Sequence, residues 1–487
     1  MFLSAKGIKA LSLGVCLATI GCPAFAVAAA SGVTEGSASA AVNAEKTRIL
    51  ILSDIGNEPD DSQSLVRFLL YSNQFDVEGI VATTSTWLRD KVNTPMIHER
   101  IDAYERVLPN LQKHAPGYPP AQALRQVVRS GRAEFGMTGV GDNKSTQASE
   151  LIIQAVDKQD DRPLWITVWG GAVDLAQALH DVQARRTPQE VAAFISKIRV
   201  YAISDQDNTG VWIRGNFPRL RYITSIHAWN EYFLSTWIGM SSSRAIGGDM
   251  SKVNNEWLAE NIRRKGLLGA VYPAVEYSME GDSPSFLYLL RTGLSDPEHA
   301  EYGGWGGRYA AIAPDDDGGL RASTSDEVVG ADGEKYRTAP ATIWRWRDAF
   351  QNDFAARMDW TLTGDVKKAN HNPNLVLNGK PGTQIVSWQV KSGESVTLSA
   401  QGSGDVDGDR VAYRWWQYKE PTATALGVHF GPGLELSHSE GEQTRFTAPD
   451  VKAATPFHII LEGKDNGSPA LTSYRRAIVT VLPAAPR

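Results

Sequence analysis

The chain has 487 residues, of which 42% are hydrophobic and 21% are charged, and its formal net charge is −6. This length exceeds what one ordinary hydrophobic core holds together, so we expect two folded domains, and the composition excludes disorder on a large scale. The acidic balance argues against nucleic acid as a partner, because neutralising phosphates requires a basic face.

The first 26 residues have the pattern of a secretory signal peptide. Lys6 and Lys9 precede an apolar run over 10–20, and Ala24-Phe25-Ala26 supplies small residues before a cleavage site. A lipoprotein signal is the alternative, because Gly21-Cys22 is a lipobox ending. Both cysteines lie in this segment, so cleavage would leave a secreted or periplasmic protein without disulfides. No later stretch is apolar and long enough to span a membrane.

After a leader over 27–44 that is rich in Ala, Gly and Ser and is expected to be flexible, the sequence alternates between strand and helix patterns. Continuous apolar runs indicate strands that are buried on both faces, and helical patterns begin near residues 65 and 175. The strands are predicted at 48–52, 77–82, 164–169 and 200–203. This alternation predicts an α/β domain over 45–366, with an open, mostly parallel sheet and flanking helices.

The pattern changes after about residue 364, where the polar segment 367–373 predicts a linker. Beyond it, short alternating stretches are separated by turns rich in Gly, Asp and Pro. These stretches lie at 395–400, 411–416, 457–462 and 477–482. They predict a C-terminal all-β, immunoglobulin-like sandwich over 370–487.

The loop after the first predicted strand is the most informative segment. It contains four carboxylates in eight residues: Asp54, Glu58, Asp60 and Asp61. Ligands of open α/β folds bind at this end of the sheet, and a hard cation such as Ca²⁺ would relieve the repulsion between the carboxylates. The alternative is that Asp60 and Asp61 only stabilise the first turn of the following helix.

This loop resembles the motif Asp-x-Asp-Pro-Gly-x-Asp-Asp of the inosine-uridine-preferring nucleoside hydrolases. The resemblance implies a nucleoside hydrolase-like fold and a bound Ca²⁺ ion. It also implies that Asp54 is the general base and a metal ligand, and that Asp60 and Asp61 are metal ligands. This loop is longer than the family's, and Leu52 stands where the family has its first aspartate.

Two further segments resemble the same family. The stretch over 168–176 is similar to the family's Thr-Gly-Pro-Leu-Thr-Asn segment, which implies that the backbone carbonyl of Trp169 binds the metal. Glu280-Gly281-Asp282 is similar to a His-Asp-Pro segment, which implies that Asp282 is the last ligand. Gly281 replaces the family's histidine. Taken singly, these segments also fit a strand-to-helix turn and a helix cap.

The layout of the mature chain resembles a more specific group as well. The acidic loop, the Gly-rich run 303–309 and the segment 344–347 are similar to those of secreted bacterial proteins described as cellulose-binding, which have a nucleoside hydrolase-like domain and a C-terminal β-domain. The resemblance implies a polysaccharide partner and leaves the activity open.

A carboxylate base beside a bound cation suits the hydrolysis of a glycosidic bond by direct attack of water, with inversion. A sugar leaving group also needs a proton, and Glu58 and Glu280 are the candidates for the acid. Each of them is also compatible with a solvated surface carboxylate.

Five further residues are predicted to bind substrate: Asn57, Asp205, Asp207, Trp305 and Arg308. Trp305 lies between glycines, so we expect a pliable loop that exposes its ring to a sugar, with Arg308 nearby to bind hydroxyls or a carboxylate. Asp205 and Asp207 follow a predicted strand, where a plain polar turn is the alternative. Core packing is the alternative for most of the 14 tryptophans, Trp87, Trp169 and Trp212 included.

Three functions are therefore compatible with the sequence. The first is a secreted calcium-dependent hydrolase of glycosidic bonds in saccharides, the second a non-catalytic polysaccharide-binding protein, and the third a nucleoside hydrolase. In the C-terminal domain, the acidic stretch 405–409 fits either a second calcium site or a tight hairpin turn.

Overall fold

The structure is a computed structural model that describes residues 46–313, 318–422 and 432–484. The predicted signal peptide and leader, with both cysteines, lie outside these residues. Among the helices of the described residues, none combines the length and the apolar character needed to cross a bilayer.

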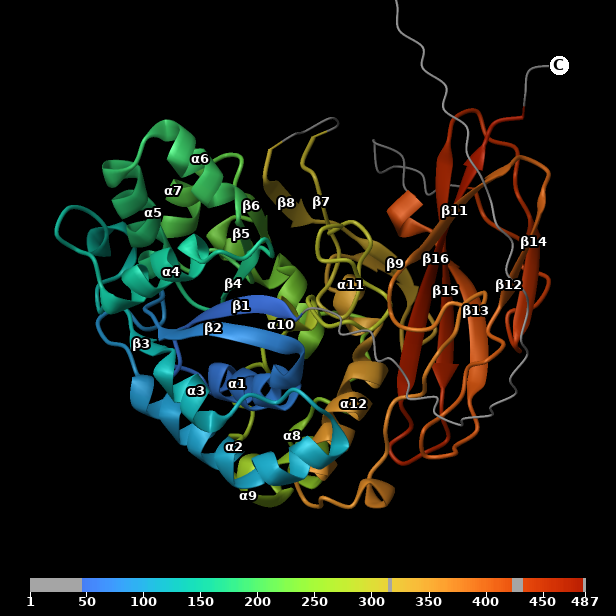
Figure 1. The fold of residues 1–487 in the computed structure, drawn as a ribbon, viewed down its shortest axis with the longest axis horizontal. Helices are drawn as coiled ribbons and strands as arrows, with labels where there is room; N and C mark the ends of the chain where they lie inside the picture. The colour runs from blue at the N-terminus through green and yellow to red at the C-terminus, as the bar shows by residue number, and fades with distance from the viewer. Residues whose placement is uncertain (1–45, 314–317, 423–431, 485–487) are drawn as a thin grey trace, which may run out of the picture. The chain divides into compact units, whose positions relative to one another are not determined.

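An eight-stranded sheet forms the centre of the N-terminal domain (Figure 1). Its order is β3-β2-β1-β4-β5-β6-β8-β7, and every neighbouring pair is parallel except β7 with β8. The strands are β1 (Thr47–Ser53), β2 (Phe75–Ala82), β3 (Val128–Ser130), β4 (Leu164–Val168), β5 (Ile198–Ala202), β6 (Arg221–Thr224), β7 (Tyr309–Ala310) and β8 (Leu320–Ser323). A short hairpin of β9 (Asp326–Val329) and β10 (Lys335–Thr338) follows.

Helices cover both faces of this sheet, which is why its strands are apolar on both sides. Ile49 and Ile51 of β1 face one hydrophobic core, and Leu50 and Leu52 face the other. The first core is covered by α1 (Pro59–Tyr71), α2 (Thr94–His114), α3 (Ala121–Gln126), α8 (Asn255–Leu258), α9 (Gly266–Ala270), α10 (Pro284–Leu287), α11 (Ala341–Trp344) and α12 (Arg347–Trp360). The second is covered by α4 (Gln147–Asp157), α5 (Val173–Arg185), α6 (Pro188–Ser196) and α7 (Thr209–Asn216).

The C-terminal residues form two small sheets around a core of their own. One sheet has the order β11-β16-β15-β13, and the other pairs β12 with β14. The strands are β11 (Val386–Lys391), β12 (Ser395–Ser399), β13 (Ala412–Tyr418), β14 (Gln443–Thr447), β15 (Thr455–Lys464) and β16 (Thr472–Leu482). The predicted fold class, an α/β domain followed by an all-β sandwich, is confirmed.

A buried charged cluster joins residues of the two parts. Asp326 accepts hydrogen bonds from Arg308 Nε at 2.7 Å, Arg345 Nη1 at 2.8 Å and Tyr418 Oη at 2.6 Å. Burial raises the pKa of Asp326, but the two arginines outweigh burial and hold this pKa below its ordinary value. Tyr418 and Tyr474 of the sandwich also belong to the larger core of the α/β domain. The charge of Asp326 is therefore balanced where the two parts meet.

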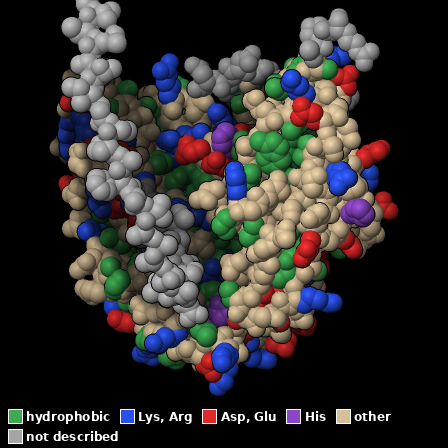
Figure 2. All heavy atoms as spheres, turned by 45° about the vertical axis from the view of Figure 1, so that its right-hand side comes forward, with side chains coloured by type: hydrophobic (Ala, Val, Ile, Leu, Met, Phe, Trp, Pro, Cys, Tyr) green, Lys and Arg blue, Asp and Glu red, His purple; other side chains and the backbone are tan. Residues whose placement is uncertain are grey.

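On the face shown in Figure 2, acidic and basic side chains are interspersed with patches of hydrophobic ones. Neither sign of charge gathers into one broad area in this view.

Candidate active site

The carboxyl ends of the parallel strands β1, β4 and β5 meet at one edge of the sheet, and the acidic loop lies there. Asp54 follows β1 directly, Trp169 follows β4, and Ile203 and Gln206 follow β5. Together they line a cavity with a volume of about 60 Å³. The complete lining consists of Asp54, Asn57, Glu58, Asp60, Asp61, Trp87, Trp169, Ile203, Gln206, Tyr232, Trp237 and Asp282.

Asp54 is held in place by its neighbours and is only 4% exposed. Ser85 Oγ donates a hydrogen bond to Asp54 Oδ2. Gly170 packs against the same side chain, and a Cβ atom at Gly170 would lie only 2.7 Å from Asp54 Oδ1. The glycine after β4 is therefore needed for the close approach of the two loops, and it leaves Asp54 little freedom to move.

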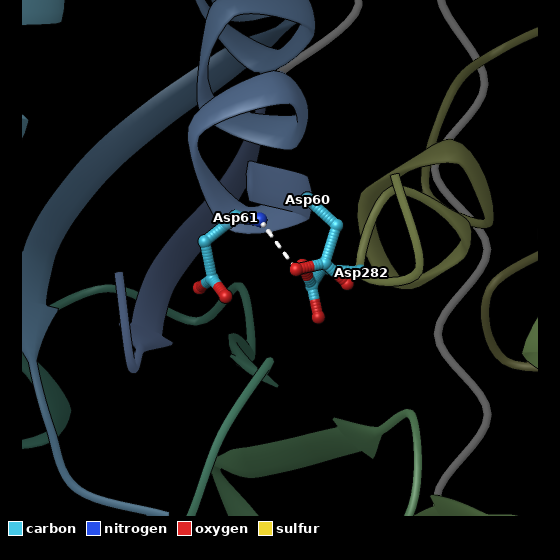
Figure 3. A group of neighbouring side chains, drawn as sticks. All are labelled: Asp60, Asp61 and Asp282. Atoms are coloured by element: carbon cyan, nitrogen blue, oxygen red, sulfur yellow. Dashed lines mark hydrogen bonds between the residues drawn. The ribbon is translucent and has the colours of Figure 1, made fainter. Parts of the chain in front are cut away.

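Three other aspartates converge beside it. Asp60 and Asp61 lie in the first turn of α1, and Asp282 comes from the segment before α10 (Figure 3). One carboxylate oxygen from each lies within 4.8 Å of the others. Asp60 Oδ1 accepts a hydrogen bond from the backbone N–H of Asp61 at 3.1 Å, and Ser53 Oγ donates to Asp61. These contacts fix the carboxylates without neutralising them.

The charges in this cluster oppose ionisation. Burial, and then the neighbouring carboxylates Glu58 and Asp54, raise the pKa of Asp60 to about 8. Burial and the adjacent aspartates also raise the pKa of Asp61 and that of Asp282 well above the ordinary range. Burial likewise raises the pKa of Asp54, although the hydrogen bond from Ser85 lowers it in part.

Among the described residues that line the cavity, none is a lysine or an arginine that could balance these charges. Hard oxygen ligands gathered at low dielectric are the donor set that Ca²⁺ prefers. The side chains of Asp60, Asp61 and Asp282, with Asp54 next to them, thus fit the ion that the nucleoside hydrolase resemblance implies. The carbonyl of Trp169 accepts a hydrogen bond from Gln206 Nε2 at 2.6 Å, and its contact with a metal stays a prediction.

Aromatic side chains lead from this cavity to the surface. Trp87 and Trp229 are 47% and 49% exposed, and their ring centroids lie 5.7 Å apart. Tyr232 contacts Trp229 at 4.9 Å and Trp237 at 5.7 Å between centroids, so the rings are continuous from surface to cavity. Flat, half-exposed aromatic rings of this kind suit the apolar face of a sugar ring.

The two predicted acids have opposite environments. Glu58 lines the cavity and is half-buried, and burial followed by the charges of Asp54 and Glu276 raises its pKa, as a proton donor requires. Glu280 is fully buried and pairs with Arg67 at both oxygens, and it also accepts a hydrogen bond from Tyr272 at 2.7 Å. The prediction of Glu280 as a catalytic acid is therefore wrong, because an internal arginine already occupies its carboxylate.

The predictions for Trp305 and Arg308 as substrate-binding residues are also wrong. Trp305 is only 3% exposed and packs edge-on against Phe350 in the core, despite its flanking glycines. Gly306 lies so close to Tyr288 that a Cβ would approach within 2.4 Å, which shows that these glycines permit tight packing and do not create a pliable loop. Arg308 is buried and paired with Asp326, as described above.

Asp205 and Asp207 do not line the cavity among the described residues, although they follow β5 as expected. Asp205 pairs with Arg214 at 2.6 Å, and Asp207 accepts a hydrogen bond from the backbone N–H of Thr209 at 2.8 Å. Their assignment to substrate binding is corrected to stabilising the turn before α7. Asn57 does line the cavity, and its role in binding stays a prediction.

Sequence reasoning missed Tyr232 and Trp237, and within the candidate turn after β5 it selected Asp205 and Asp207 instead of Gln206. Gln206 stands between the two aspartates that drew attention, and its place after a strand was the available signal. Trp237 lies in a short helical segment (Thr236–Met240) that has no motif. It explains Gly281, because a Cβ there would lie 3.0 Å from both the Trp237 ring and Asp60 Oδ2. A larger side chain at that position would press against this tryptophan.

Comparison with known proteins is consistent with this geometry. Residues 48–309 match the model of the nucleoside hydrolase-like domain of cellulose-binding Sde182, and residues 395–481 match that of the C-terminal domain of cellulose-binding protein Sde0182. The chain belongs to the Sde182 family. Both parts of the resemblance drawn from the sequence, the hydrolase-like domain and the cellulose-binding group, are thereby confirmed.

Solved structures include a relative that matches nearly the whole chain. A nucleoside hydrolase-related hypothetical protein from Saccharophagus degradans that is associated with carbohydrate metabolism is 36% identical, with a TM-score of 0.76, and the match covers 90% of this chain and 100% of that chain. The type III effector XopQ, solved with adenosine diphosphate ribose, is 12% identical with a TM-score of 0.31, covering 65% of this chain and 95% of that one. We infer nothing about function from similarity at that level. A comparison with curated proteins found no match.

Proposed function

We propose that this protein is a secreted, calcium-dependent hydrolase. It binds a polysaccharide against the exposed aromatic rings at the opening of the cavity, which we call the mouth, and cleaves a glycosidic bond beside Asp54. The observation that carries the proposal is a set of four aspartates, three of them buried and Asp60 half-buried, without a balancing cationic side chain in a cavity that opens toward half-exposed aromatic rings. Buried like charges are costly to maintain, and such perturbed carboxylates in a pocket are typical of functional sites.

Asp60, Asp61 and Asp282 would hold the Ca²⁺ ion, with Asp54 at its edge. When bound, the ion supplies positive charge that orients oxygen ligands and keeps these carboxylates ionised at neutral pH. Asp54, anchored by Ser85, accepts the proton of the attacking water. Glu58, whose pKa is raised, donates a proton to the leaving oxygen.

The size of the cavity supports a substrate ring that lies outside it. About 60 Å³ accommodates an ion and a few waters, but not a sugar ring. The ring must therefore lie at the mouth, against Trp87 and Trp229. Two buried polar atoms of lining residues, Gln206 Oε1 and Trp237 Nε1, have no partner within the described structure, and they are an acceptor and a donor suited to sugar hydroxyls.

The test is a screen of the purified mature protein against insoluble and soluble polysaccharides and against nucleosides, with and without chelator. We expect binding and slow release of reducing ends that stops in chelator. Release of free base from nucleosides at a higher rate than any saccharide cleavage would contradict the proposal.

Tryptophan variants locate the binding face. Trp87→Ala should weaken polysaccharide binding by roughly 3- to 10-fold, on the order of one lost aromatic contact. Trp388→Ala is the control, because Trp388 is a half-buried tryptophan of the sandwich. If Trp388→Ala weakens binding and Trp87→Ala does not, the sandwich carries the binding face instead.

A second candidate is a polysaccharide-binding protein without catalysis. It is favoured by Gly281, which replaces the histidine of the related hydrolases and lies close to Trp237, and by the family's description as cellulose-binding. Measurable polysaccharide binding with no turnover of any substrate would select it.

A further inference from the structure

The C-terminal sandwich contains a second group of acidic residues, away from the candidate active site. Strands β13 and β15 pair so that Ala412, at the start of β13, lies opposite Lys464, at the end of β15. This register brings the acidic turn before β13, which includes Asp405, next to Asp465, the residue after β15.

The carboxylate of Asp465 is bonded on one side only. Its Oδ1 atom accepts hydrogen bonds from the backbone N–H groups of Gly467 at 3.0 Å and Leu471 at 2.9 Å, and from Asn370 Nδ2 at 3.1 Å. Its Oδ2 atom is buried and has no partner in the described structure, in a residue that is only 4% exposed.

Asp405 repeats this arrangement from the other side. Its Oδ1 atom accepts from the backbone N–H groups of Asp407 at 2.8 Å and Asp409 at 3.3 Å, whereas its Oδ2 atom is also buried without a partner among the described residues. Burial raises the pKa of Asp465, and the charge of Asp405 raises it further, so the two carboxylates are close enough to repel. Within the described residues, neither forms an ion pair with a lysine, arginine or histidine.

We propose that Asp405 and Asp465 bind a Ca²⁺ ion between their two free Oδ2 atoms. A hard cation is the ligand that two buried, unpaired carboxylate oxygens require, since a neutral ligand would leave the repulsion in place. Two carboxylates supply only part of the coordination shell, and the remaining oxygens have to come from backbone carbonyls and water. Few charged ligands correspond to a weak site, with a dissociation constant of about 10⁻⁴–10⁻³ M.

The site would stabilise the joint between the two parts of the chain. Asn370, which donates to Asp465, also accepts a hydrogen bond at its backbone carbonyl from Trp360 Nε1 at 2.9 Å, at the end of α12. The next residue, His371, bonds Asp407 through its backbone N–H at 2.8 Å and contacts His114 of α2 at 3.0 Å between ring nitrogens. An ion at Asp465 therefore holds the segment that connects the two parts.

The experiment uses the full mature chain in the Asp60→Asn background, which removes the other proposed calcium site. Thermal melts and isothermal titration with CaCl₂ alone should show one ion per chain and a rise in melting temperature of about 2–4 °C at 10 mM. In Asp60→Asn/Asp465→Asn both responses should disappear. Asp450→Asn, an exposed carboxylate of the same domain, is the matched control and should keep them.

Thermal melts in chelator separate calcium binding by Asp465 from a purely structural role of this residue. The amide that Asp465→Asn introduces keeps the Oδ1 acceptor and removes the repulsion with Asp405. This variant should therefore melt at or above the parent in chelator, yet gain nothing from calcium. A proton shared between the two carboxyl groups is the competing account. This account predicts no calcium response in the Asp60→Asn background, and that result would overturn the proposal. A calcium response that persists after Asp465→Asn would overturn it as well. The unmodified chain and the two single variants separate the two proposed sites. If the unmodified chain binds one ion, and this ion is lost in Asp465→Asn but kept in Asp60→Asn, only the calcium site of the proposed function is contradicted.

Discussion

Two groups of acidic side chains in this protein differ in whether the chain supplies positive charges to neutralise them. At the candidate active site, Asp54, Asp61 and Asp282 are buried and Asp60 is half-buried beside them, and none of the four has an ion pair with a cationic side chain within the described structure. Where the α/β domain meets the sandwich, Asp326 is also buried but lies between Arg308 and Arg345.

The pKa values follow this difference. That of Asp326 is below its ordinary value, whereas those of the four aspartates at the site are above theirs. Compensated burial stabilises a junction, because charge and counter-charge are both supplied by the chain. Uncompensated burial is typical of sites where a ligand or a reaction uses the charge. Glu280 belongs with the compensated charges, since Arg67 neutralises its carboxylate.

The largest expected effect is on turnover. Asp54→Asn keeps the shape and the hydrogen bond from Ser85 but cannot accept a proton, so turnover of a confirmed saccharide substrate should fall by about 10²–10⁴. Initial rates at saturating substrate measure this, with the exposed Asp161→Asn as a control. Near-normal turnover in Asp54→Asn would show that Asp54 is not the general base. The uncompensated charges of the site would then have no demonstrated role in catalysis.

The next effect concerns the compensated cluster. Asp326→Asn leaves Arg308 and Arg345 buried without their counter-charge, and the free energy of unfolding should fall by about 3–5 kcal/mol. Urea unfolding measures it. Asp348→Asn is the control, because Asp348 pairs with Lys252 and Lys464 at the surface, and such pairs contribute at most about 1 kcal/mol. Equal effects of the two variants would show that burial does not distinguish these pairs.

Calcium should stabilise the uncompensated cluster. At a concentration about 100 times the dissociation constant, an ion bound only by the folded chain adds about 2.7 kcal/mol to the free energy of unfolding. Asp60→Asn should abolish the part of this gain that comes from the active site. In chelator it should raise stability, because the raised pKa of the Asp60 carboxyl opposes folding at neutral pH and an amide removes that cost. Lower stability of Asp60→Asn in chelator would mean that the four carboxylates do not repel as inferred.

The smallest expected effect is a pH dependence at the junction. Burial, followed by the charge of Arg476, lowers the pKa of His458 from 6.5 to about 2, and Arg476 Nη1 donates to His458 Nδ1 at 2.9 Å. The unfolded chain therefore binds a proton below about pH 6.5 that the folded chain does not. This contribution is fully present above that pH and is lost as the pH falls, by about 1.4 kcal/mol per unit.

His458→Asn keeps an acceptor for Arg476 and should remove this slope between pH 7 and about 5.5 in urea melts recorded at several pH values. His438→Asn, at an exposed histidine, should leave the slope unchanged. An identical slope in His458→Asn and the parent chain would show that His458 is not kept neutral by the fold.

Much of the fold could be predicted from the sequence because its signals are local. The apolar run that became β1 ends within one residue of the predicted boundary, and four predicted sandwich strands coincide with β12, β13, β15 and β16. Alternation of strand and helix patterns was enough to predict the parallel sheet. The short strands β3, β6, β7, β8, β9 and β10 were not predicted, because two to four residues carry too little periodicity.

The sequence by itself also determined the acidic part of the site. Asp54, Asp60 and Asp61 lie within eight residues after a buried strand, so local order alone brings them to the carboxyl edge of the sheet. Asp282 was found through its motif, and the structure places it beside them.

Only the tertiary structure decided which polar side chains already have a partner within the protein and which are available to a ligand. Glu280 and Arg67 are 213 residues apart in the chain, and nothing near Glu280 shows that its charge is neutralised. The glycines around Trp305 indicated exposure, yet they allow its ring to pack in the core. Trp237 reaches the cavity, and the turn that contains Asp405 comes next to Asp465, only through long-range packing. Local patterns determine which residues are polar or apolar, but the burial and the partner of each side chain depend on segments that meet only in the folded protein.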